Sequence, residues 1–129
     1  MNTCTTISNP VDVGEVVSKS AREFNHNRFV DGVPVVVGVG RFVEQKQFSV
    51  LLEAFKRLTC HTEARLVMVG DGPRREDLKK LAVELGIEDR VDFLGFVSNH
   101  YKYMRRADLL AISARVEGHP VVALEALAC

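Results

Sequence analysis

The chain has 129 residues, of which 47% are hydrophobic and 26% are charged, a composition typical of one globular domain with one core. Its 17 basic and 17 acidic residues cancel, which excludes a long-range field for drawing in nucleic acid or an anionic membrane. The three cysteines form no C-x-x-C pair, which argues against a disulfide framework or a zinc site and favours a reducing cytoplasm.

Short β-rich runs alternate with helical patterns from Pro34 onward, which is typical of a parallel sheet covered by helices. Strands and the turns after them are expected at 34–42, 65–73, 90–96 and 107–113. Helical spacing of apolar residues predicts helices from about residue 46, over 78–85 with Gly86 as its cap, at 100–106 and from about Pro120. A further helix is predicted over 13–24.

Ligands of open parallel sheets bind where loops leave the carboxyl ends of the strands. In the first such loop, Arg41 and Lys46 come after the turn at Gly40 and precede a helix, whose free N–H groups and dipole favour anions. Two cations there would make a phosphate site, although two solvated loop charges explain the spacing equally well. The loop is not of the G-x-x-x-x-G-K type, and Val43 stands where a dinucleotide fingerprint needs a small residue.

The second loop is G-D-G-P, Gly70 to Pro73. A tight turn between strand and helix explains most of it. Gly70 and Gly72 would also let a ligand approach the backbone.

The third loop leads into the stretch E-G-H-P-V-V-A-L-E-A, residues 117–126. Its helix is apolar on every side, which predicts burial, and Glu125 is its one charge. Because an ionised carboxylate in such a place is costly unless paired, Glu125 needs donors from sugar hydroxyls or from a basic neighbour. Glu117, beside the flexible Gly118, can face the same cleft.

The start of this last helix offers backbone N–H groups to an anion near Val121 and Val122. Simpler explanations stay open for the acids, namely a surface loop acid for Glu117 and a structural salt bridge for Glu125. His119 fits a loop residue better than a catalytic base.

Four motifs in this order resemble the retaining glycosyltransferases of family 4, which have the GT-B fold of two facing Rossmann-like domains. They are V-G-R-F-V-E-Q-K (39–46), V-G-D-G-P (69–73), V-D-F-L-G-F-V (91–97) and E-G-H-P-V-V-A-L-E-A (117–126). The resemblance implies an α/β fold, with residues 1–33 as an amino-terminal helical segment packed on the domain. Residues 34–129 would form the carboxyl-terminal nucleotide-sugar-binding domain, truncated at its end and without the acceptor domain. Gln47 departs from the family, which usually has glycine there, as does Ala114, where serine is frequent.

The resemblance also implies roles for individual residues. Arg41 and Lys46 would neutralise the diphosphate of the donor as it leaves, and Glu117 would hydrogen-bond the donor sugar. Glu125 would accept from the ribose hydroxyls, the helix start would hold phosphate, and the base would lie beside residues 96 and 97. The full set of expected substrate-binding residues is Gly40, Gly72, Phe96, Val97, Gly118, His119, Pro120, Val121, Val122 and Glu125.

The function implied is transfer, with retention, of a sugar from a UDP or GDP donor to a glycan or lipid-linked acceptor in surface polysaccharide or lipopolysaccharide synthesis. No metal, other cofactor or nucleic acid is expected. The full-length protein would be cytoplasmic, with room for a peripheral contact at the inner face of the membrane. This piece alone would be inactive, because a GT-B active site lies between two domains. A GT-B sugar-nucleotide epimerase and a non-catalytic flavodoxin-like module are the alternatives.

Overall fold

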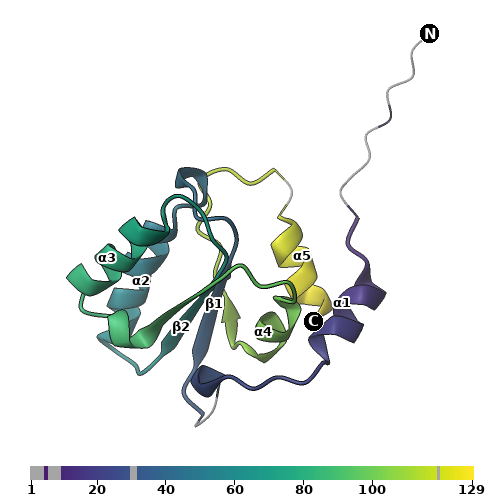
Figure 1. Ribbon diagram of the computed structural model, residues 1–129, viewed down its shortest axis with the longest axis horizontal. Helices are drawn as coiled ribbons and strands as arrows, with labels where there is room; N and C mark the ends of the chain where they lie inside the picture. Colours follow the sequence, from purple (N-terminus) through teal and green to yellow (C-terminus); the bar gives the residue numbers. More distant parts are fainter. Residues whose placement is uncertain (1–4, 6–9, 30–31, 119) are drawn as a thin grey trace.

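The computed structural model describes residues 5, 10–29, 32–118 and 120–129, and within them a parallel sheet of four strands forms the centre of the molecule (Figure 1). The strand order is β3-β2-β1-β4, and Val37 in β1 has Val67 on one side and Leu110 on the other. The expected α/β, Rossmann-like sheet is thereby confirmed. The strands are β1 (Val35–Val39), β2 (Arg65–Val69), β3 (Val91–Gly95) and β4 (Leu109–Leu110).

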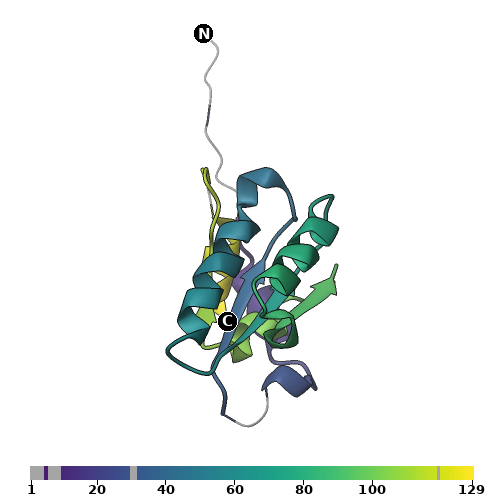
Figure 2. The same cartoon turned by 90° about the vertical axis from the view of Figure 1, so that its left-hand side faces the viewer.

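Two helices cover one face of this sheet, α2 (Phe48–Thr59) and α3 (Arg75–Glu84), as Figure 2 shows. Their apolar stripes match the predicted spacing and meet the side chains of β2 in one buried cluster. Each such buried side chain contributes roughly 1.5–3 kcal/mol. The members from these elements are Phe48, Leu51, Leu52, Phe55, Leu66, Met68, Leu78 and Ala82.

The helices α1 (Val13–Ser20), α4 (Tyr101–Arg106) and α5 (Val121–Ala128) group together on the other side of the sheet (Figure 1). Asp12 caps α1 by accepting from the Glu15 backbone N–H. The helix ends at Ser20, earlier than the expected end at residue 24, and the Ser20 hydroxyl donates to the Val17 carbonyl. This local bond competes with continuation of the helix.

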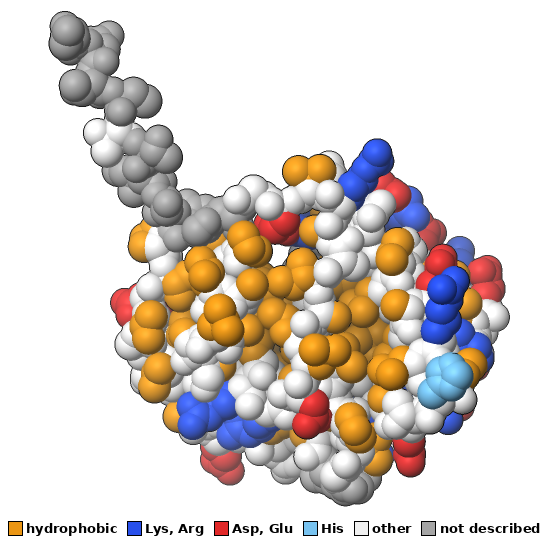
Figure 3. Space-filling view, turned by 180° about the vertical axis from the view of Figure 1, so that it is seen from behind, with side chains coloured by type: hydrophobic (Ala, Val, Ile, Leu, Met, Phe, Trp, Pro, Cys, Tyr) orange, Lys and Arg blue, Asp and Glu red, His pale blue; other side chains and the backbone are white. Residues whose placement is uncertain are grey.

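The expected burial of α5 is wrong. None of its residues is buried, and Leu127 is 86% exposed. The helix packs against α1 and α4. Figure 3 shows hydrophobic side chains gathered over one broad face of the molecule. A helix that is apolar on every side was expected to be buried, but the described residues do not bury it.

The edge strand β4 is shorter than the expected strand over 107–113. The Ala111 N–H still donates to the Val37 carbonyl of β1, and the chain then bonds to the loop that follows β1. The Ser113 hydroxyl donates to the Lys46 carbonyl over 2.8 Å, and the Arg115 N–H donates to the Gln45 carbonyl over 2.9 Å. These two bonds join the loop after β4 to the loop after β1. They stand in place of the ladder bonds that a longer β4 would make.

Candidate functional site

The strand order places a crevice at the carboxyl end of β1. From β1 the chain runs to β2 and β3 on one side and returns to β4 on the other, so the carboxyl end of β1 is the switch point at which sheets of this kind bind ligands. Two cavities of about 290 and 390 Å³ open there, and Val39, the last residue of β1, lines both. The cavities therefore adjoin.

The first cavity brings together several residues that the sequence singled out. Lys46 and Glu117 line it, together with the start of α5 at Pro120, Val121 and Val122. No side chain of the described residues caps this helix start. The first N–H groups of a helix have no partner within it, so they and the positive end of the helix dipole are available to an anion that enters this cavity.

Lys46 and Glu117 form an ion pair with 2.6 Å between Nζ and Oε2. The Lys46 side chain is 34% exposed and the Glu117 side chain 27%, so solvent reaches both. Ser113 holds the backbone of Lys46 in place through the bond to its carbonyl. The sequence did not single out Ser113, because its partner lies 67 positions away in the chain.

Gln47 sets the direction of α2 behind Lys46. It has φ 47° and ψ 44°, and among the described non-glycine residues it alone has a positive φ. The predicted helix from residue 46 is thus divided into a turn over Glu44–Lys46 and α2 from Phe48. A side chain in this left-handed conformation costs roughly 1–2 kcal/mol, which explains why glycine suits the position.

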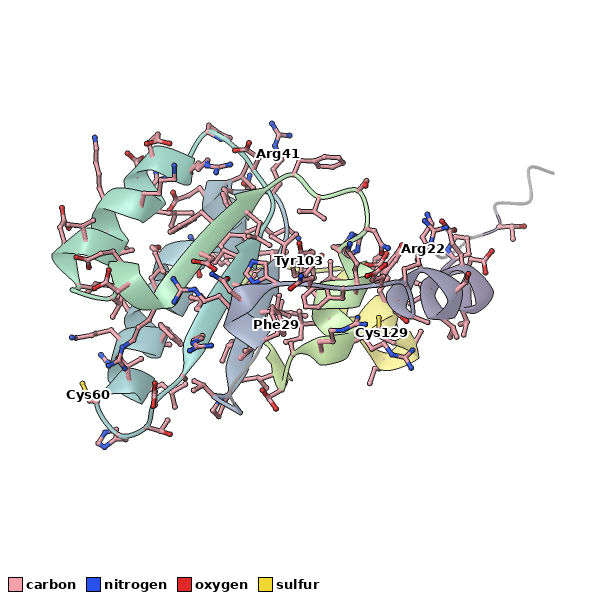
Figure 4. The ribbon with its side chains drawn as sticks, turned by 60° about the horizontal axis from the view of Figure 1, so that its bottom comes forward. Arg22, Phe29, Arg41, Cys60, Tyr103 and Cys129 are labelled. Atoms are coloured by element: carbon pink, nitrogen blue, oxygen red, sulfur yellow. The ribbon has the colours of Figure 1, made fainter. Side chains whose placement is uncertain are left out.

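The second cavity holds a different set of predicted residues. Arg41, Phe96 and Val97 line it together with Gly40. Arg41 lies at the carboxyl end of the strands, far from Cys60 at the other end (Figure 4), and its guanidinium has no hydrogen-bond or ion-pair partner within the described part of the chain. Phe96 is 84% exposed. Lys46 and Arg41, the two basic side chains predicted to bind phosphate, thus line adjoining cavities.

Glu125 lines neither cavity, but it reaches the second one through His100. Its Oε2 lies 2.9 Å from His100 Nε2, and Tyr101 donates its hydroxyl to Oε1 over 3.3 Å. His100 lines the cavity with Arg41 and Phe96. The sequence predicted that Glu125 needs hydrogen-bond donors. His100 and Tyr101 supply them, and His100 is a basic neighbour.

Burial raises the pKa of the Tyr101 phenol above its ordinary value of 10.0, and the nearby Glu125 carboxylate raises it further. Burial likewise raises the pKa of the Cys129 thiol, whose Sγ donates to the Tyr101 carbonyl. The neutral forms are therefore favoured, and a neutral Tyr101 keeps its proton for Glu125.

The glycines after β2 allow two loops to approach each other. A Cβ on Gly70 would lie 1.8 Å from the Gly40 carbonyl oxygen, and one on Gly72 would lie 2.6 Å from the Phe42 carbonyl oxygen. Gly40 and Gly70 line the second cavity, whereas Gly72 packs on Phe42 and lines neither of the two.

Two further predicted residues, Gly118 and His119, precede α5 in the chain. Gly118 is exposed, with open space where a Cβ would stand. His119 lies outside the described residues.

No group of three or more His, Cys, Asp or Glu side chains among the described residues is placed to hold a metal ion. No helix in the same part of the chain is long and apolar enough to cross a membrane.

Residues 19–129 match the family model of the glycosyl transferases group 1. The chain belongs to this family. The family predicted from the four motifs is thereby confirmed, and with it the relation to GT-B glycosyltransferases.

Two curated relatives illustrate the match. One is the N-acetylgalactosamine-N,N'-diacetylbacillosaminyl-diphospho-undecaprenol 4-alpha-N-acetylgalactosaminyltransferase of Campylobacter jejuni, 32% identical over 98% of this chain and 33% of the relative. The other is the lipopolysaccharide core biosynthesis glycosyltransferase LpsE of Rhizobium meliloti, 35% identical over 95% of this chain and 34% of the relative. The chain therefore spans about a third of the length of these group 1 glycosyltransferases.

Solved structures show the same fold. The lipopolysaccharide outer core galactosyltransferase WaaB has a TM-score of 0.69 and 30% identity over 77% of this chain and 29% of its own. Anabaena HepE in complex with UDP-glucose has a TM-score of 0.68 and 27% identity over 95% of this chain and 32% of its own.

Proposed function

We propose that the chain is the donor-binding domain of a glycosyltransferase that takes a sugar from a UDP or GDP donor. One observation carries this proposal: two adjoining cavities at the end of β1 are each lined by a basic side chain, Lys46 in the first and Arg41 in the second. Their volumes lie near the lower end of the roughly 300–1,000 Å³ of small-molecule sites. An elongated ligand with a charged middle fits such a pair.

The diphosphate of the donor would lie where the cavities meet. Lys46 and the free N–H groups of Val121 and Val122 face it from the first cavity, and Arg41 faces it from the second. Charge-assisted bonds to phosphate are about twice as strong as neutral ones. The leaving diphosphate gains charge as the glycosidic bond breaks, so these groups stabilise the transition state more than the bound donor.

The two ends of the donor would occupy different cavities. Glu117, which lines the first cavity, would accept hydrogen bonds from the hydroxyls of the sugar, since a carboxylate only accepts. Phe96 in the second cavity offers an exposed ring to the base, with Val97 beside it. Glu125, held by His100 at this cavity, would accept from the ribose.

The comparisons support this donor and a place in surface glycan synthesis. HepE, which shares 27% identity with the chain, has been solved in complex with UDP-glucose. LpsE takes part in lipopolysaccharide core biosynthesis, and the name of the Campylobacter relative includes a diphospho-undecaprenol acceptor. We therefore propose a glycan or lipid-linked acceptor, bound by a separate acceptor domain. These relatives are transferases, which favours transfer over the epimerase and the non-catalytic module.

Three further properties of the whole protein belong to the proposal. Transfer occurs with retention at the anomeric carbon, and we assign no covalent role to Glu117. The protein works in the cytoplasm, with a peripheral contact to the inner face of the membrane where a lipid-linked acceptor is used. An NMR measurement of the anomeric configuration of the product tests retention.

Calorimetric titration with UDP, GDP and UDP-glucose tests donor binding. We expect the folded chain to bind at least one of them, and Arg41→Ala to weaken that binding about tenfold or more, as the loss of a bond to a charged group does. Lys80→Ala, an exposed charge on α3, is the matched control and should change nothing. Absence of binding by a chain that circular dichroism shows to be folded would refute the proposal.

A further inference from the structure

His100 connects the Glu125 carboxylate with the second cavity. It precedes α4, and its Nε2 lies 2.9 Å from Glu125 Oε2. The same imidazole lines the cavity with Arg41, Phe96 and Val97, whereas Glu125 does not. Of the side chains that contact the Glu125 carboxylate, it is therefore the one exposed to the cavity.

The Glu125 carboxylate is fixed in orientation at both oxygens. Tyr101 donates to Oε1, and His100 faces Oε2. Since a carboxylate only accepts, His100 Nε2 must carry the proton of this bond. The His100 and Tyr101 rings also lie against each other, with 4.3 Å between their centroids. The two donors thus act as one unit at the start of α4.

Two bonds do not saturate the carboxylate. It has about four acceptor positions, so each oxygen of Glu125 keeps a free one. The Glu125 side chain is only 13% exposed, which limits the directions from which a ligand can donate to it. A ribose diol, with two neighbouring hydroxyls, has one donor for each of these oxygens.

We infer that His100 is a positioning residue for the ribose of the donor: it holds Glu125 in the orientation in which the carboxylate accepts from the ribose diol. The inference rests on the proposed donor binding. The simpler alternative is that His100 merely ties α4 to α5. The two differ in one respect: a positioning residue affects ribose recognition, whereas a tie affects the binding of all nucleotides equally.

The test compares UDP with 2′,3′-dideoxy-UDP, which lacks the diol, by calorimetric titration of the chain. The unmodified chain should bind UDP about tenfold or more tightly than the dideoxy nucleotide, since the diol donates to a charged group. His100→Ala should bring this ratio close to one by weakening UDP alone. His100→Gln, whose amide can still donate to Glu125, should retain part of the ratio.

Arg105→Ala is the matched control on α4. It removes the bond from Arg105 to the Ser20 hydroxyl, which ties α4 to α1, and should leave the ratio unchanged. An unchanged ratio in His100→Ala, with either equal weakening or no weakening of both nucleotides, overturns the inference and leaves the donor site standing. If the folded, unmodified chain binds neither UDP, GDP nor UDP-glucose, the proposed function itself fails, and the inference falls with it.

Discussion

Lys46 Nζ lies 2.6 Å from Glu117 Oε2, so the loop after β1 is joined by an ion pair to the loop before α5. Both side chains are partly exposed, and pairs of this kind contribute about 0–1 kcal/mol to stability. The pair matters instead for binding, because an incoming phosphate must compete with Glu117 for the Lys46 ammonium.

Replacing Glu117 with Gln should therefore increase the affinity of the chain for free UDP. The substitution removes the competing charge and leaves Lys46 available, and we expect a gain of roughly twofold to fivefold at low salt, within the range of an exposed ion pair. Glu44→Gln is the control, because Glu44 pairs with Arg74 outside both cavities. A tenfold loss of UDP affinity in Glu117→Gln would show that Glu117 itself helps to bind the nucleotide.

Phe96→Ala should weaken nucleotide binding without affecting stability. A base stacked on an aromatic ring gains about 1–3 kcal/mol, so the dissociation constant should rise by roughly fivefold to 150-fold. Because Phe96 is 84% exposed, the melting temperature should stay the same. Leu127→Ala removes an apolar side chain that is 86% exposed and should change neither quantity. Equal affinities of the Phe96→Ala chain and the unmodified chain would place the base elsewhere.

Gly70→Ala should destabilise the fold by more than about 2 kcal/mol. The added Cβ would stand 1.8 Å from the Gly40 carbonyl oxygen, so the loops after β1 and β2 would have to separate. Gly14→Ala is the control in α1, where alanine improves helix propensity by up to about 1 kcal/mol. Urea denaturation gives both values. Equal stability of Gly70→Ala and the unmodified chain would contradict the close packing of the two loops.

The phenol of Tyr101 should titrate above pH 10. Its pKa is raised by burial and by Glu125, so the folded state holds this proton more tightly than the unfolded state does. The associated stability is fully present below pH 10 and is lost as the pH rises through the folded-state pKa. Ultraviolet titration in a Tyr103→Phe background measures Tyr101 alone, since the chain has two tyrosines. Glu125→Gln should move the titration back toward pH 10; no movement would contradict the contact.

The sequence predicted those parts of the fold that depend on neighbours in the chain. Alternating β-rich and helical runs located all four strands of the described sheet, and the apolar stripe of α2 located its face. The shortening of β4 could not be predicted, because it depends on bonds from Ser113 and Arg115 to a loop about 70 positions earlier. Burial of α5 would require packing partners on every side, and an apolar sequence pattern does not show whether such partners exist.

In the candidate site, too, the sequence indicates some residues and only the fold reveals others. Lys46 and Glu117 could be singled out because charges at the ends of strands and helices are unusual, and the structure brings them together. His100 gave no signal, since a lone histidine in a sequence is most often a loop or packing residue. Only the fold shows that it lies beside Glu125, 25 positions later.

The most direct test of the central claim, that the two adjoining cavities form one donor site, is an NMR titration of the ¹⁵N-labelled chain with UDP-glucose. We expect the amides of Arg41, His100 and Val121 to shift together, with one dissociation constant. Shifts confined to a different cavity, the one that Lys79 of α3 and Phe93 of β3 line, would contradict the claim.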